Sequence, residues 1–393
     1  MNTSADLTLP ALTAAERRRG LAAAISSVTV FGLGITLGGP LLSLILEARG
    51  TDATLNGLNY ASSFLGVILG PWLTPAAVRW LGIRRLLLIC LALNIAFFQL
   101  MYVLDNIAAW FVLRAALGLV GSTIFTTTEA WINLLASDHG RGRIIGFYIA
   151  ALSAGFAVGP LMLSVTGIAG WTPFLAASAI VAVSAIPLLG VGGEAHHLGR
   201  EPGRGVLAIF GQAPFILFAT ALAGFYEQTT LSLLPVWGLR IGLSMALAAA
   251  TLTSVYLGAI ALQVPIGWLS DRMPRLSALR LCAAAGVLGA ALLVVVGGAT
   301  LPLYAVLFFW GGMATGIYPV ALAMAGERFT GSDLVSVNAA MIMSYGLGGL
   351  LGPVLGGVAM DLRNPEGLPV LLLLLFAFFL VATLLRKDRP RAR

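Results

Sequence analysis

Apolar runs separated by short polar gaps repeat along the whole chain. A helix needs about 20 apolar residues to cross the hydrocarbon layer of a membrane, which is roughly 30 Å thick. Applied to this sequence, that length predicts an all-α membrane protein with twelve membrane-crossing helices, centred near Ile35, Phe64, Leu93, Gly121, Gly155, Val181, Leu222, Val255, Leu288, Met313, Gly346 and Phe376.

One polar gap is longer than the others. The stretch GGEAHHLGREPGRG, residues 192–205, separates the sixth apolar run from the seventh. We interpret it as a linker. The sequence therefore predicts an N-terminal six-helix bundle (1–191), a cytoplasmic linker (192–206) and a C-terminal six-helix bundle (207–393).

Basic residues gather in alternate gaps. If the N-terminus is cytoplasmic, nineteen arginines and lysines lie at cytoplasmic positions, whereas three, Arg49, Arg240 and Arg363, lie outside. Cytoplasmic loops of membrane proteins carry such an excess. The distribution predicts a multi-pass membrane protein with both termini in the cytoplasm.

Composition agrees with a membrane protein and argues against other classes. Of the 393 residues, 59% are hydrophobic and 10% are charged, which is unusual for a soluble domain. The formal charge of +7 follows from the topology, so we expect no nucleic-acid partner. The chain lacks a phosphate-binding loop and any cluster with metal-ligand spacing. We therefore expect no enzyme activity, no cofactor and no metal.

Parts of the first half recur in the second. The cysteines Cys90 and Cys282, both in apolar runs and interpreted as small core residues, are 192 positions apart. Residues of the fifth helix recur in the eleventh at a shift of 193: Gly155, Gly159 and Pro160 against Gly348, Gly352 and Pro353. A common shift of about half the chain indicates two related six-helix halves.

Three local motifs add to this organisation: GWLSDRMPR (267–275), RAALGLVG (114–121) and GFYIAALSAGFAVGP (146–160). Together with the two halves, they resemble the major facilitator superfamily and its gate, helix 4 arginine and helix 5 antiporter motifs. Two departures are Pro274 for a glycine of the first motif and Leu163-Ser164 for a glycine pair after the third. The segments 128–148, 231–244 and 343–357 look closest to the YcaD-like bacterial branch. That resemblance implies the bacterial inner (plasma) membrane.

The resemblance implies a cytoplasmic gate formed by Gly267, Asp271, Arg272, Arg275 and Glu327. Asp271 is expected to accept backbone N–H groups at the start of the fifth helix, and Arg272 or Arg275 to pair with Glu327. A solvated loop that only orients the protein is the alternative. The gap between the second and third helices, residues 74–85, lacks the family's aspartate, so a symmetric gate is not expected.

The recurring glycines and prolines remove side chains and a backbone donor, which permits close helix approach and bending. In the family, helices 5 and 11 meet helices 8 and 2 of the opposite halves. These residues are therefore predicted to form a hinge at the interface: Gly155, Gly159, Pro160, Gly348, Gly352 and Pro353. A generic packing seam explains the same residues.

Three ionisable residues lie within the predicted spans: Arg114, Glu129 and Glu227. Burying an unpaired charge in a membrane is expensive, so each is expected to face a partner or a watery cavity. Glu129 lies roughly 22 Å further inward than Arg114 at 1.5 Å per residue. Arg114 and Glu227, both placed in the outer half of the membrane, could form a bridge. We predict proton coupling through these three residues, with a structural polar clasp as the alternative for Glu129.

The resemblance places helices 1, 4, 7 and 10 around a central cavity. Candidate cavity residues on them are Thr29, Thr36, Tyr226, Gln228, Trp310 and Tyr318. Such a lining favours a small amphipathic organic solute, because only Arg114 could meet negative charge. We therefore predict a monomeric secondary active transporter in membrane lipid, with protons as partner and export by antiport favoured. Import or facilitated diffusion, and a non-transporting membrane scaffold or assembly factor, are the alternatives.

Overall fold

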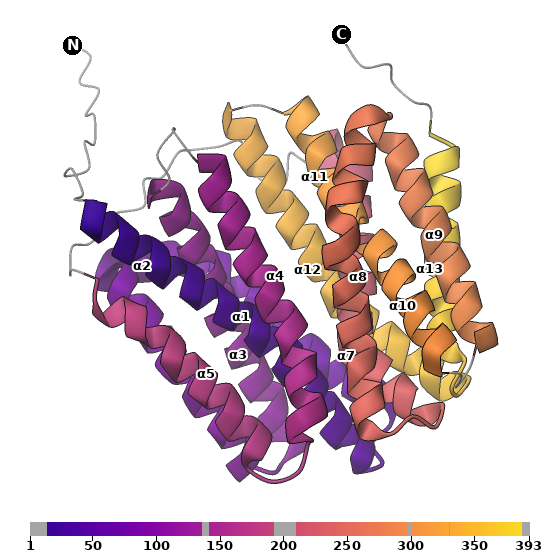
Figure 1. Cartoon of the computed structure of the whole chain (residues 1–393), viewed down its shortest axis with the longest axis horizontal. Helices are drawn as coiled ribbons and strands as arrows, with labels where there is room; N and C mark the ends of the chain where they lie inside the picture. The colour runs from indigo at the N-terminus through magenta and orange to yellow at the C-terminus, as the bar shows by residue number, and fades with distance from the viewer. Residues whose placement is uncertain (1–13, 136–140, 192–209, 297–299, 330, 387–393) are drawn as a thin grey trace.

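A computed structural model describes residues 14–135, 141–191, 210–296, 300–329 and 331–386 (Figure 1). The predicted linker and its histidines lie outside these residues. Within them the chain folds into helices: α1 (Ala14–Ala48), α2 (Ala53–Val103), α3 (Ile107–Leu135), α4 (Arg141–Thr166), α5 (Thr172–Leu189), α7 (Pro214–Arg240), α8 (Met245–Arg272), α9 (Arg275–Val296), α10 (Thr300–Thr315), α11 (Ile317–Arg328), α12 (Gly331–Leu362) and α13 (Gly367–Leu384).

These helices account for the twelve predicted crossings. In the described residues, nine helices are long and apolar enough to cross a membrane, and the longest, α2, contains the second and third predicted spans. The gap expected between these two spans, residues 74–85, contains the break between them at Gly82, but the rest of that segment is helical. Gly82 has φ 74° and ψ 159°, a backbone conformation that residues with a side chain rarely adopt. A single residue therefore reverses the chain.

The helices pack as two bundles of six crossings, which lie side by side in Figure 1. Equivalent contacts recur in both. Gly66 on α2 lies directly against the backbone of Ala115 on α3, and Gly258 on α8 lies directly against that of Phe308 on α10. Arg84 donates hydrogen bonds to carbonyls at the end of α5, and Arg280 does so at the end of α13. These shared contacts agree with the predicted repeat.

The glycines predicted as an interface hinge pack inside their own bundles. Gly155 and Gly159 on α4 lie against Thr29 and Thr36 of α1. Their counterparts pack likewise on α7, where Gly348 meets Ala221 and Gly352 meets Thr229. The predicted orientation toward the opposite half is therefore wrong for these four glycines, whereas the backbone of Pro353 does meet Gly57 of α2 in the opposite half. A hinge role of the six residues stays a prediction. Their small size serves close packing of α1 with α4 and of α7 with α12.

The halves meet near one end of the molecule. We call the end where α1 begins and α13 ends the terminal face, and the other end the opposite face. Contacts between the halves run along α2 from the opposite face to its middle: Gly57 lies against the Pro353 backbone, Gly349 against Phe64, and Gly346 near Ile68. The hydrophobic core of the second bundle extends to Tyr60 and Phe64 of α2. The described structure is thus closed toward the opposite face.

Candidate functional site

A series of hydrogen-bonded side chains begins at Glu227 in the second half and ends at Tyr60 in the first. The partly buried carboxylate lies midway along α7, and its Oε2 accepts a hydrogen bond from the Tyr345 hydroxyl at 2.6 Å. That hydroxyl accepts one from Gln228 Nε2 at 2.8 Å. Gln228 Oε1 in turn accepts one from the Tyr60 hydroxyl at 2.9 Å. We call these four residues the polar bridge, because Tyr60 is on α2 and the others are on α7 and α12.

Every donor in the polar bridge is oriented toward Glu227. An ionised carboxylate only accepts hydrogen bonds, and bonds to it are stronger than bonds between neutral groups. The Tyr345 ring is held by an edge contact with Tyr318 of α11, with centroids 5.6 Å apart. Tyr256 of α8 stacks on Phe156 of α4, at 5.9 Å, and lies within electrostatic reach of Glu227. Tyrosines of α8, α11 and α12 therefore lie near this carboxylate, and Phe156 of the first half contacts one of them.

Arg114 lies beside Tyr60, the residue of the polar bridge that belongs to the N-terminal bundle. It is 4% exposed, and its guanidinium carbon lies 5.0 Å from the centre of the Tyr60 ring, a cation–π arrangement. Its Nε donates to Asn59 Oδ1 at 2.7 Å, and its Nη2 donates to the Gly39 carbonyl at 3.3 Å. In the part of the chain that the structure describes, the bridge to Glu227 considered from the sequence is not formed. Glu227 lies at the middle of its helix rather than in the outer half, and the two charges are linked through Tyr60.

Glu129 lies closer to the terminal face than Arg114 does. Its side chain is exposed, whereas the nearby Trp131 is 3% exposed and packs in the N-terminal bundle. Tyr318 lies within electrostatic reach of both Glu129 and Glu227. The two carboxylates therefore act on one tyrosine, and Glu129 is the more exposed of the two.

Four predicted cavity residues lie away from the polar bridge. Tyr226 and Trp310, 1% and 2% exposed, pack edge to face with centroids 5.1 Å apart. The Trp310 indole donates to the Gly286 carbonyl at 3.1 Å inside the C-terminal bundle. Thr29 and Thr36 bond backbone carbonyls of their own helix, where α4 covers them. Of the six predicted residues, Gln228 and Tyr318 lie at the polar bridge.

The predicted gate residues gather at the terminal face. Arg275 forms ion pairs with Asp271 and with Glu327, each at 2.9 Å, so the expected pairing with Glu327 is present. Arg272 instead lies 3.9 Å from the centre of the Trp268 ring. Gly267 has open space around it, so no close approach requires a glycine there. The expected contact of Asp271 with the start of α4 involves side chains outside the described residues.

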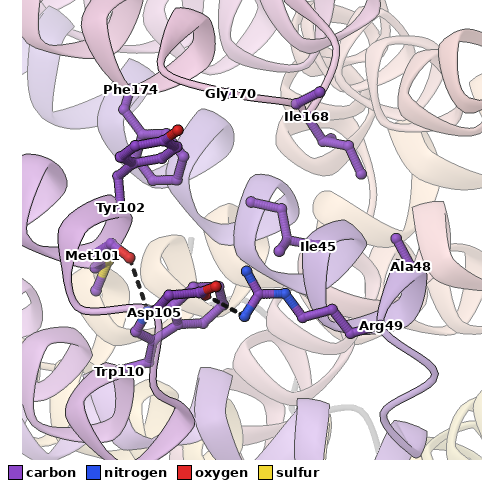
Figure 2. Close-up of a pocket in the computed structure, with 11 residues that line it drawn as sticks. Ile45, Ala48, Arg49, Met101, Tyr102, Asp105, Trp110, Ile168, Gly170 and Phe174 are labelled. Carbon is purple, nitrogen blue, oxygen red and sulfur yellow. Dashed lines mark hydrogen bonds and ion pairs between the residues drawn. The ribbon is translucent and has the colours of Figure 1, made fainter.

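A separate cavity of about 450 Å³ opens at the opposite face of the N-terminal bundle. Figure 2 shows Arg49 paired with Asp105 at its edge, beside Trp110. The Arg49 guanidinium lies 4.9 Å from the centre of the Trp110 ring. Tyr102 and Phe174 form another wall, with ring centroids 5.5 Å apart. This cavity is lined by one half alone and is distinct from the polar bridge.

Comparison with known protein families shows to which family this chain belongs. A family model described as Major Facilitator Superfamily matches residues 24–311 and 216–393, which together include most of the chain. The chain belongs to the major facilitator superfamily. It is therefore a membrane transport protein and not an enzyme.

Similar superfamily proteins are themselves described as uncharacterized MFS-type transporters. YfkF of Bacillus subtilis (strain 168) is 26% identical over 84% of this chain and 85% of that protein. A Yersinia pestis (strain Pestoides F) protein is 26% identical over 92% of this chain and 94% of that protein. The resemblance to the YcaD-like branch stays a prediction.

Solved superfamily structures share the fold. The nucleoside transporter NupG superposes with a TM-score of 0.75 at 13% identity, covering 95% of this chain and all of that one. A bacterial homologue of the human lysosomal transporter Spinster, in an inward-facing and unoccupied conformation, gives 0.68 at 14% identity, covering 95% of each chain. At these identities the likeness concerns architecture alone.

Sequence reasoning missed several residues of the site. Asn59 and Tyr60 lie on the second crossing, Tyr256 on the eighth and Tyr345 on the eleventh. The residues predicted to line the cavity were instead sought on helices 1, 4, 7 and 10. The available signal was a set of polar or hydroxyl-bearing side chains within apolar runs. Their importance comes from contacts between the halves, which one sequence does not reveal.

Proposed function

We propose that this protein is a proton-coupled secondary transporter that exports a small amphipathic organic solute across the bacterial inner membrane. It acts as a monomer with both termini in the cytoplasm, so the terminal face is cytoplasmic. The observation that carries the proposal is the polar bridge, which ties a membrane-embedded carboxylate to a contact between the halves. The antiporter-like motif 146–160 favours export as the direction.

The polar bridge gives protonation of Glu227 a structural consequence. An ionised Glu227 accepts a charge-assisted hydrogen bond from Tyr345, which leaves the Tyr345 oxygen to accept from Gln228. A proton on Glu227 weakens that acceptor and frees Tyr345 to rotate. Gln228 then loses a partner, and its bond from Tyr60 no longer holds α7 to α2. Proton binding would in this way favour separation of the halves.

Glu129 would serve as the cytoplasmic carboxylate of the same pathway. It is exposed and lies closer to the terminal face, while Glu227 is partly buried, and Tyr318 is within electrostatic reach of both. A proton released from Glu227 would therefore meet Glu129 before reaching the cytoplasm. Arg114, buried and unable to lose its proton, would keep a positive charge beside the bridge and favour an ionised Glu227 after release.

The surroundings of the polar bridge also limit the solute. Tyrosine hydroxyls and the Gln228 amide offer hydrogen bonds, and the tyrosine rings offer flat apolar surfaces. Arg114 is the described cation at this site, which disfavours polyanions. Nucleosides combine a flat ring with hydroxyl groups, and a structural neighbour is titled a nucleoside transporter. They belong in the screen beside amphipathic amines.

The proposal is tested in two steps. A thermal-shift screen of purified protein with nucleosides, metabolites and amphipathic amines identifies a stabilising solute, because binding to the folded state raises apparent stability. That solute is then followed in proteoliposomes with an imposed pH gradient. Glu227→Gln should abolish gradient-driven accumulation and retain counterflow, since glutamine keeps the shape without titrating. Glu366→Gln, a change of the same kind at the opposite face, is the control. Accumulation by Glu227→Gln at the parental level would refute the coupling.

A further inference from the structure

A carboxylate from the second half lies on the start of a helix in the first. Asp361, near the end of α12, accepts two backbone hydrogen bonds at the beginning of α2: Oδ1 from Ala53 at 3.0 Å and Oδ2 from Thr54 at 2.8 Å. Oδ2 also accepts the Thr54 hydroxyl at 2.7 Å. The first N–H groups of a helix lack partners within it and carry its positive end. Asp361 satisfies both needs across the interface.

The same carboxylate is connected to α1 and α7. Arg240, at the end of α7, makes a two-pronged contact with Glu47 of α1, Nε to Oε1 at 2.8 Å and Nη2 to Oε2 at 3.0 Å. Its Nη1 lies 3.6 Å from Asp361. The Arg240 and Glu47 side chains are 14% and 17% exposed, so water screens this pair less than a surface pair. At the closed end, α1, α2, α7 and α12 are therefore joined by charged contacts.

We infer that Asp361, Arg240 and Glu47, with the start of α2, form the latch that holds the opposite face closed. The contacts of Asp361 with the start of α2 and of Arg240 with Glu47 join the two halves, whereas the contact between Arg240 and Asp361 lies within the second half. The contacts that join the halves must break if the halves separate at this face. The inference goes beyond the proposed function, because it concerns which conformation is stable and needs neither a solute nor a proton gradient.

The latch is one-sided. In the repeat, the position that matches Asp361 is Ile168, which cannot accept a hydrogen bond through its side chain. The helix that corresponds to α2 is α8. Each is capped by a residue of its own, α2 by Asp52, which accepts from the Leu55 N–H at 2.6 Å, and α8 by Ser244, which accepts from the Leu247 N–H at 3.4 Å. In the part of the chain that the structure describes, a carboxylate of the other half is bonded to the start of α2 and not to that of α8. The second half thus supplies the carboxylate that bonds the start of a helix across the opposite face, as it carries Asp271 at the terminal face. Single substitutions in that half should therefore affect closure strongly.

The test measures distances between spin labels in the full chain in liposomes. Cys90 and Cys282, both buried, are first replaced by alanine. One labelled pair, Ala108→Cys with Leu247→Cys, spans the halves near the opposite face, and a second, Arg79→Cys with Gly326→Cys, spans the terminal face. Asp361→Ala should raise the ratio of molecules open at the opposite face to closed molecules by about ten-fold, the scale set by losing charged hydrogen bonds. The terminal-face pair should shorten in parallel.

Controls separate the latch from general damage. Asp105→Asn breaks the pair with Arg49 at the same face but within one half, and should leave both distance distributions unchanged. If Asp361→Ala does not yield folded protein, Glu47→Gln and Thr54→Val each remove part of the latch and should shift the same ratio two- to three-fold. The inference is overturned if the folded latch variants keep the parental distributions, or if Asp105→Asn shifts them equally. Neither result depends on the proton-coupling proposal.

Discussion

Replacing Gly57 with alanine is expected to open the opposite face without unfolding either half. A methyl group added there would contact the Pro353 carbonyl oxygen and lie 2.6 Å from its carbonyl carbon, whereas ordinary contact begins at 3.4 Å. Both obstacles are backbone atoms, so no side-chain rotation relieves the clash and α2 must move away from α12. Overpacking of this kind costs about 1–3 kcal/mol. Because the strain exists only while the halves touch, it should raise the ratio of open to closed molecules at this face roughly five-fold to a hundred-fold.

Two matched glycines make this prediction sharp. At Gly346, on the same interface, an added methyl group would meet Ile68 Cγ1 at 3.6 Å, so Gly346→Ala should change little. Gly155 is as crowded as Gly57, but its neighbour is the Thr29 backbone within the same bundle. Opening does not relieve that clash. Gly155→Ala should therefore lower the temperature of thermal unfolding and leave the conformational ratio unchanged.

Spin-label distances and tryptophan-fluorescence melting, both in the cysteine-labelled background, distinguish these outcomes. The expected pattern is a changed distance distribution for Gly57→Ala and a changed melting temperature for Gly155→Ala. If both variants only lowered the melting temperature, the contact between α2 and α12 would have to persist in every conformation. The assignment of Gly57 to a moving interface would then be refuted.

Two further substitutions address the polar bridge. Tyr345→Phe removes the hydroxyl that joins Glu227 to Gln228 but keeps the ring against Tyr318, so gradient-driven uptake in proteoliposomes should fall about ten-fold with the melting temperature nearly unchanged. Parental uptake would contradict a role for the bridge. Glu129→Gln should reduce proton-driven transport less than Glu227→Gln does, because an exposed site retains access to water; an unchanged response to the pH gradient would assign Glu129 to structure instead.

Much of the fold could be predicted because lipid imposes a length on each helix. The apolar runs around Leu93 and Phe376 predict crossings that the structure contains, and the shift that relates Gly155 to Gly348 corresponds to equivalent contacts in both bundles. Local ion pairs were also accessible, as with Arg275 and Glu327, because they join ends of helices within the same bundle. These features depend on the length of the apolar runs, on the constant shift between the two halves, and on contacts within one bundle.

Contacts between the halves could not be predicted in the same way. Whether Gly155 faces α1 or the other half depends on rotation of a helix about its axis, and a helix that is apolar all round gives little signal for that rotation. Arg240 and Asp361 are far apart in sequence from Glu47 and Ala53, so nothing local predicts their contact. Tyr226 and Gln228 are two positions apart, yet one lies in a core and the other in the polar bridge.

The single-residue reversal at Gly82 has a mechanical consequence. With one residue between them, the two limbs of α2 cannot slide independently, and a displacement of one pulls the other with it. The first limb carries the Gly57 contact and Tyr60, whereas the second packs on α5 at the rim of its bundle. A displacement of the first limb, where α2 contacts the other half, is thereby transmitted to the second limb and to α5. A spectroscopic label on α5 should consequently detect movement of the first limb of α2 against the other half.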